Sequence, residues 1–119
     1  MRALCVKIIS PVTREEVLEH PGVRLDHEYE VLSILVEPGR GAKFRILTAD
    51  GTPALFDAAM FVTTEAEIPR NWVVRAREGG VVDFAPAAWL ESGFWERFFD
   101  RDPTAVAGFE AERREAAAR

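Results

Sequence analysis

The chain has 119 residues, of which 48% are hydrophobic and 29% are charged, and its formal net charge is −5 at pH 7. This composition is typical of one globular domain and excludes a disordered chain. No apolar run approaches the ~18–20 residues that a membrane-spanning helix needs. The acidic balance also disfavours a general nucleic-acid binder, because such proteins carry a basic face that neutralises phosphates.

The first residues are typical of a strand and not of a secretion signal. Lys7 interrupts the N-terminal apolar stretch, and no small-residue cleavage site follows it. The single cysteine, Cys5, has no partner for an internal disulfide. We therefore expect a reduced, buried thiol in a cytoplasmic protein.

A strand is predicted over residues 2–9, with Leu4, Val6 and Ile8 on one face. The Ser-Pro pair that follows breaks it. A short helix is predicted over residues 14–20, because Thr13 is a suitable N-cap and two glutamates lie in the first turn. Pro21 ends that helix, since proline disfavours helical geometry in the preceding residue.

A long strand is predicted over residues 28–36, and it is apolar on both faces. Tyr29, Val31 and Leu35 share one face, whereas Leu32, Ile34 and Val36 share the other. A surface strand with one solvated face does not have this pattern. We therefore expect packing on both sides of this strand.

A further strand is predicted over residues 42–48, because apolar and charged residues alternate there. Phe44 and Ile46 would point inward, and Lys43 and Arg45 outward. An Asp-Gly turn at residues 50–51 follows it. The remaining predicted β elements are a strand over residues 54–63 and a hairpin formed by residues 72–77 and 81–85.

The composition changes after Pro86 and becomes helical. Residues 86–90 favour one helical turn, Ser92 can cap a second helix, and Asp102 followed by Pro103 starts a third whose last turn we expect to fray. An aromatic stripe at helical spacing marks the second helix. It consists of Phe94, Trp95, Phe98 and Phe99. We expect this stripe to cover the sheet.

One resemblance follows from the order of apolar and turn residues. The residues that carry it are Leu25, Tyr29, Val31, Leu32, Ile34, Phe44, Ile46, Asp50, Gly51, Phe56 and Phe61. This order resembles the SH3-like barrels of many small bacterial and phage proteins over residues 1–64, although His27 stands where a glycine is expected. The resemblance implies a strongly bent antiparallel barrel of five or six strands within residues 1–86, and it does not include the helical tail. Together with the helical pattern after Pro86, we predict a single α+β domain in which residues 87–119 form a C-terminal helical lid.

The barrel with its acidic, aromatic tail also looks like uncharacterised proteins of bacterial toxin–immunity loci. That resemblance implies a non-catalytic inhibitor of a protein partner. The acidic charge favours a basic partner, reached by electrostatic steering. The predicted partner-binding residues are Glu91, Trp95, Glu96, Asp100 and Asp102.

The sequence offers little catalytic chemistry, and we predict no catalytic residue, metal or cofactor. Ser10, Ser33 and Ser92 lack the glycine context of a nucleophile elbow, and the loop at residues 39–41 lacks the Lys-Ser/Thr of a phosphate-binding loop. The acidic residues Asp50, Asp57 and Asp83 lie at predicted turns and strand edges.

Two alternatives stay open. The first is a small nucleic-acid-associated regulator that uses Arg-bearing strands. Its basic residues would be Arg40, Lys43, Arg45, Arg75 and Arg77. The second is a small metal-dependent enzyme that uses the loop containing His20 and His27, with Asp26, Glu28 and Cys5 as further candidate ligands.

Overall fold

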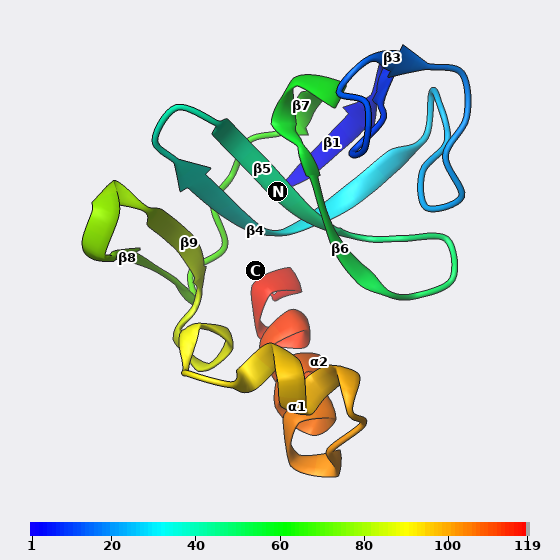
Figure 1. Cartoon of the computed structure of the whole chain (residues 1–119). Coiled ribbons are helices and arrows are strands. Elements are labelled where there is room, and N and C mark those ends of the chain that lie inside the picture. The colour runs from blue at the N-terminus through cyan, green and yellow to red at the C-terminus, as the bar shows by residue number, and fades with distance from the viewer. Residues whose placement is uncertain (119) are drawn as a thin grey trace.

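Strand β4 (Glu28–Glu37) organises the sheet, because three other strands pair with it. In the computed structural model, which describes residues 1–118, an open and mostly antiparallel sheet packs against two helices (Figure 1). The protein is therefore an α+β domain.

The other strands are β1 (Arg2–Cys5), β2 (Ile8–Ile9), β3 (Glu16–Val17), β5 (Gly41–Leu47), β6 (Pro53–Asp57), β7 (Phe61–Glu65), β8 (Trp72–Ala76) and β9 (Val82–Pro86). The helices are α1 (Phe94–Phe99) and α2 (Pro103–Ala117), with 3-10 turns at Ala58–Met60, Glu78–Gly80 and Ala87–Leu90.

The sheet forks along β4. Residues 28–30 of β4 pair with β1, residues 34–36 pair with β9, and β5 runs along the opposite edge. The main strand order is β6-β5-β4-β1-β7, and β8 pairs with β9 as a branch. Within the described residues β6, β7 and β8 each pair with a single strand. The sheet is thus not a closed barrel, and the predicted SH3-like barrel is not confirmed.

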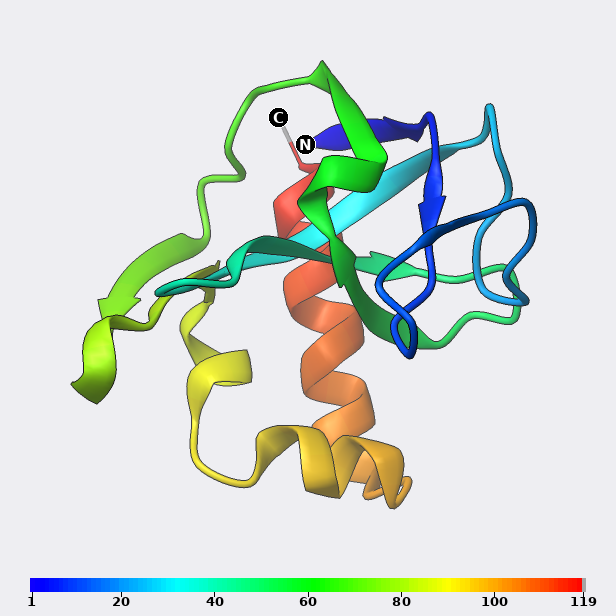
Figure 2. The same cartoon turned by 45° about the horizontal axis from the view of Figure 1, so that its top comes forward.

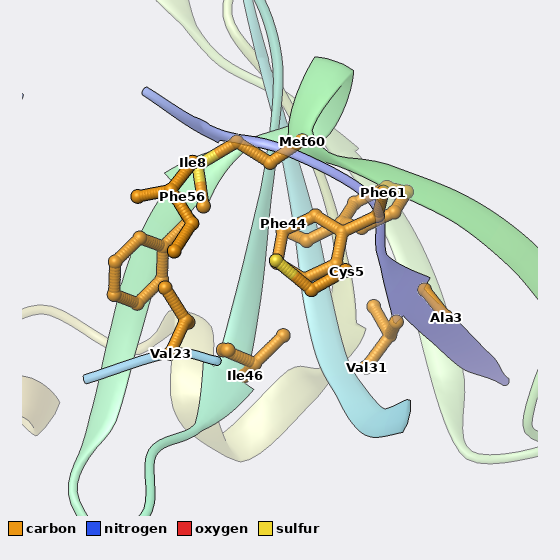
Figure 3. Packing of buried hydrophobic residues seen from close by; sticks show 10 residues of the cluster. All are labelled: Ala3, Cys5, Ile8, Val23, Val31, Phe44, Ile46, Phe56, Met60 and Phe61. Atoms are coloured by element: carbon orange, nitrogen blue, oxygen red, sulfur yellow. The ribbon is translucent and has the colours of Figure 1, made fainter. Parts of the chain in front are cut away.

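The two faces of β4 serve two separate cores, as its apolar pattern predicts. Val31 belongs to the first core, which the strands and the loops around them enclose (Figure 3). Leu32 belongs to the second core, which lies between the sheet and the helices. A register shift between Val31 and Ser33 lets both Val31 and Leu32 be buried at 2% exposure. After this shift Ile34 packs against the first core and not with Leu32, so its predicted face is wrong.

Residues after Pro86 supply most of the second core. Its buried members are Leu32, Ala85, Trp89, Phe94, Ala105 and Phe109. Helix α2 runs along the sheet and brings its C-terminal end beside the start of β1, and α1 lies at the opposite end of α2 (Figure 2). The helix starts as the sequence predicts, because the Asp102 carboxylate accepts a hydrogen bond from the Thr104 N–H at 3.2 Å and Pro103 follows it. The prediction that helices cover the sheet is confirmed.

The first twenty residues differ from the prediction. The predicted strand over residues 2–9 is broken at Val6 and Lys7, whose N–H groups both donate to the Met60 carbonyl. The break turns the chain, so Ala3, Cys5 and Ile8 are buried together in place of the predicted face.

The helix predicted over residues 14–20 is absent. Arg14 has a φ of 65°, which is left-handed and incompatible with a continuing helix. Residues 16–17 pair with β2 as strand β3, and Leu18 is 86% exposed. The Thr13 hydroxyl accepts from the Glu15 N–H and forms a local turn in place of a helix cap.

Three smaller predictions are also corrected. The strand predicted over residues 54–63 is divided into β6 and β7, because Asp57 caps a 3-10 turn through the Ala59 N–H at 2.9 Å. The N-cap of helix α1 is Gly93, which has a left-handed φ of 79°, and not Ser92 as predicted. Arg45 does point away from the first core, but it meets the helices and not solvent.

Candidate functional site

The corner between α1 and α2 carries the residues that the sequence indicates for partner binding, and the structure separates them into two groups. Phe94 is buried, Trp95 and Phe98 are half-buried, and Phe99 is 51% exposed. The first three pack in or against the second core. Phe99 is thus the member of the aromatic stripe with a large surface left for contact with another molecule.

Trp95 is held inside the protein by its neighbours. Its ring lies at 5.8 Å from the Trp89 ring and 6.0 Å from the Phe109 ring, measured between centroids. The Arg45 guanidinium stacks over it at 4.0 Å from the ring centroid. Burial lowers the pKa of Arg45 to about 10, with Asp83 opposing the shift, so Arg45 remains a cation at neutral pH. Trp95 therefore supports the corner and offers only part of its surface to a partner.

The acidic residues of this corner also differ in role. Glu91, Glu96 and Asp100 are exposed, and none has an ion-pair partner among residues 1–118. Asp102 instead caps α2 and lies 3.9 Å from Arg97. Asp100 ends α1 one turn after Glu96, with its N–H bonded to the Glu96 carbonyl at 2.9 Å. Glu96 and Asp100 therefore present two uncompensated carboxylates close to Phe99.

A hollow of about 320 Å³ lies beside Phe99. One wall is the β5–β6 turn with Asp50, and the other is formed by α1, the left-handed Arg101 and Val106 of α2. Hydrogen bonds from the Thr48 hydroxyl and from Thr52 lower the pKa of Asp50, so this carboxylate is charged and fixed in place. The hollow thus combines apolar side chains, Phe98, Phe99 and Val106, with one carboxylate, Asp50, and one cation, Arg101.

A second hollow, of about 210 Å³, lies at the fork of the sheet, between the start of β1, β4 and the end of α2. Trp72 and Trp89 line it together with charged side chains. Its charges are compensated, because Arg113 pairs with Glu30 at 3.0 Å and Arg2 pairs with Glu28. This hollow has no net charge that would select a ligand.

The histidine loop does not gather ligands. Among residues 1–118, no group of three or more His, Cys, Asp or Glu side chains lies close enough to hold a metal ion. The His20 ring accepts the Gly22 N–H at Nδ1 (3.0 Å) and packs edge-on against Phe56, with centroids 5.2 Å apart. These contacts give His20 a structural role in the loop.

The strand cations do not form one basic face. Lys43 pairs with Glu37 at 3.5 Å, Arg77 pairs with Asp83 at 2.7 Å, and Arg75 donates to the Leu90 carbonyl at 3.3 Å. Arg45 is occupied by Trp95. Of the five proposed basic residues, Arg40 is the one without an ion pair, side-chain hydrogen bond or ring contact within residues 1–118.

Comparison with known proteins adds no family to these observations: no family model, curated protein or solved structure matches the chain. Within residues 1–118, no helix has the length and apolar character that crossing a membrane requires. The functional conclusion must therefore come from the corner itself. Sequence patterns did not reveal that Asp50 and Val106 belong to this corner, because they are 56 positions apart along the chain.

Proposed function

We propose that this protein is a non-catalytic interaction module that binds a basic protein through the surface of α1 and the α1–α2 turn. The observation that carries the proposal is the half-exposed Phe99 ring beside the unpaired carboxylates of Glu96 and Asp100. An aromatic ring at the centre and charges at the rim form the usual arrangement of a protein-binding surface.

The charges suit a basic partner. Carboxylates at the rim attract Lys and Arg side chains and increase the association rate, and salt weakens this effect. The hollow beside Phe99 accepts an apolar side chain of the partner while the partner's cations reach Asp50 and Asp100. In biological terms we propose immunity-type inhibition, in which the module covers a basic surface of a partner encoded beside it.

The test is a binding titration with the protein encoded by the neighbouring reading frame, purified separately. Wild-type chain is compared with the double variant Glu96→Lys/Asp100→Lys by calorimetry at ~50 and ~200 mM salt. We expect the variant to bind at least about tenfold more weakly at low salt, with a smaller difference at high salt. Phe99→Ala should weaken binding at both salt concentrations.

The matched control is Glu15→Lys/Glu19→Lys, which changes net charge equally at two exposed residues of the loop around β3. This control separates a local surface from a general effect of charge. Equal affinity of the corner variant and the wild type would overturn the proposal, as would an equal loss in the control variant. Asp102 is unsuitable for this test because it caps α2.

A further inference from the structure

Strand β8 forms an open edge of the sheet, at a distance from the α1–α2 corner. It pairs with β9 and with no other strand of the described residues. The β8–β9 hairpin projects from the body of the protein (Figures 1 and 2). Val74 at the middle of β8 is 67% exposed, and Val73 is 38% exposed. Natural proteins usually shield such an edge or pair it with another strand.

The backbone of Val74 is directed outward. The Arg77 N–H donates to the Val81 carbonyl at 2.7 Å, so position 77 faces β9. The direction of the backbone N–H and C=O groups alternates from residue to residue along an antiparallel strand. Those of Val73 and Arg75 therefore also point toward β9. The N–H and C=O groups of Val74 and Ala76 point to the free side. These groups are available to another strand.

An apolar row leads from the first core to this edge. Phe44, Ile34, Phe84 and Val74 are directly opposite one another on four neighbouring strands. Phe44 is buried at 9% exposure, and exposure rises along the row to Val74. The row stops at β8 without a covering element. A strand added to β8 would continue it.

We infer that a second copy of this chain supplies that strand, by antiparallel pairing of β8 with β8 of the partner copy about a two-fold axis at Val74. This register places Val74 against its own copy and continues the apolar row. The large Trp72 then faces the small Ala76 of the partner copy. Such an interface is isologous, and the same patch serves both chains.

Charge supports this register. Arg70 lies two residues before β8 and Glu78 two residues after it. In a strand pair centred on Val74, position 70 of each copy is therefore opposite position 78 of the other copy. Both side chains are exposed. Arg70 lies 3.9 Å from Glu115 of its own chain, at the edge of ion-pair range, and Glu78 has no ion pair within the described residues. Centring the axis on Arg75 would place two guanidinium groups opposite each other, which destabilises a strand pair. The charges thus select the register at Val74 and fit a second copy of this chain.

A pair of five-residue strands buries little area, and interfaces below ~1,200 Å² belong to the weak, transient class. We therefore expect a dimer with a dissociation constant between about 1 μM and 1 mM. Sedimentation equilibrium of the full chain from ~10 μM to ~1 mM measures it directly. A chain that stays monomeric throughout this range overturns the inference.

Val74→Pro is the most selective variant. It removes an outward N–H and leaves the bonds to β9 in place, and proline is tolerated at such edge positions. We expect at least a tenfold weaker dimer with an unchanged unfolding midpoint. Should this variant lose stability, Val74→Lys tests the same edge, because two opposed lysines repel across the axis. A dimer unaffected by a folded edge variant overturns the inference.

A charge exchange tests the register. Arg70→Glu and Glu78→Arg should each weaken dimerisation several-fold, and the double variant should recover most of the loss. If the affinity losses of the two single variants add up in the double variant, the register is wrong. An assembly larger than a dimer would contradict a closed interface with two-fold symmetry. Glu96→Lys/Asp100→Lys should leave the dimer unchanged, so this inference and the proposed function fail independently.

Discussion

The two cores of this protein are built by different means. The first core takes its residues mainly from strands, where inward side chains occur at every second position, as at Phe44 and Ile46. The second core takes most of its residues from segments after Pro86, where aromatic rings occur at helical spacing and stack on one another. Strand β4 joins the two cores, with Val31 in one and Leu32 in the other.

This difference shows how a small chain buries a strand on both sides. The loops and outer strands cover one face of β4, but on the other face the first 86 residues add little more than Leu47 to the cover of Leu32 and Ala85. The aromatic helices supply that cover. Once they are packed there, most of the aromatic stripe is unavailable for binding, and Phe99 with its acidic neighbours remains at the surface.

The largest effect should come from removing a ring of the second core. Phe109 is 1% exposed, stacks on Trp89 at 4.9 Å and lies 4.8 Å from Phe98. We expect Phe109→Ala to lower the free energy of unfolding by ~3–5 kcal/mol, measured by urea denaturation. The control is Phe99→Ala, which should cost less than ~1 kcal/mol because its ring is half exposed. Equal losses would show that the second core does not depend on Phe109.

The separation of the cores is tested by a double-mutant cycle. Val31 lies opposite Ile46 in the first core, so Val31→Ala and Ile46→Ala should couple by ~0.5–3 kcal/mol. Leu32→Ala with Ile46→Ala should be additive within ~0.5 kcal/mol, because Leu32 belongs to the other core. Both cycles use urea unfolding. Strong coupling of Leu32 to Ile46 would indicate one continuous core.

A smaller effect should follow from removing the cap that starts α2. The Asp102 carboxylate accepts from the Thr104 N–H, and α2 carries Phe109 into the second core. Asp102→Ala should lower stability by ~0.5–2 kcal/mol in thermal or urea unfolding. Asp100→Ala, two residues earlier, should change it by less than ~0.5 kcal/mol. A reversed order of these two effects would contradict the assigned role of Asp102.

The smallest effect concerns the thiol of the first core. Cys5 is fully buried, and desolvation raises the pKa of its thiol. The folded state therefore keeps the proton longer than the unfolded state, whose thiol titrates near ~8.5. Stability should fall as pH rises above that value, until the folded thiol also ionises. Urea unfolding from pH 7 to 10 should show a steeper decline for the wild type than for Cys5→Ala, whereas parallel curves would contradict it.

Much of the sheet was predictable because strand alternation is a local property. The strand at residues 28–37, the inward pair Phe44 and Ile46, and the β8–β9 hairpin follow from side-chain period and turn residues. The predicted helix at residues 14–20 was wrong. Thr13 and the glutamates after it are suitable for a helix start, but Thr13 forms a local turn instead, and residues 16–17 pair with β2.

The candidate site was predictable in composition and not in arrangement. The acidic residues and the aromatic stripe are visible along the chain, but exposure divides them into supporting and surface groups. Arg45 illustrates the reason. Side chains alternate between inward and outward along β5, and this alternation correctly places Arg45 outside the first core. Only the position of Trp95 decides that the outer face is covered at Arg45. Asp50 reaches the same corner through a turn that is remote in sequence.

The sequence by itself determined an acidic α+β chain with a strand that needs cover on both faces, because composition and side-chain period are local quantities. Tertiary structure alone decided that the sheet stays open and forks at residues 31–33. It also decided which stripe residues are buried, and that Glu96, Phe99 and Asp100 form the accessible corner while β8 keeps a free edge. The physical reason is that burial and strand pairing depend on which distant segments meet, and no local pattern records that.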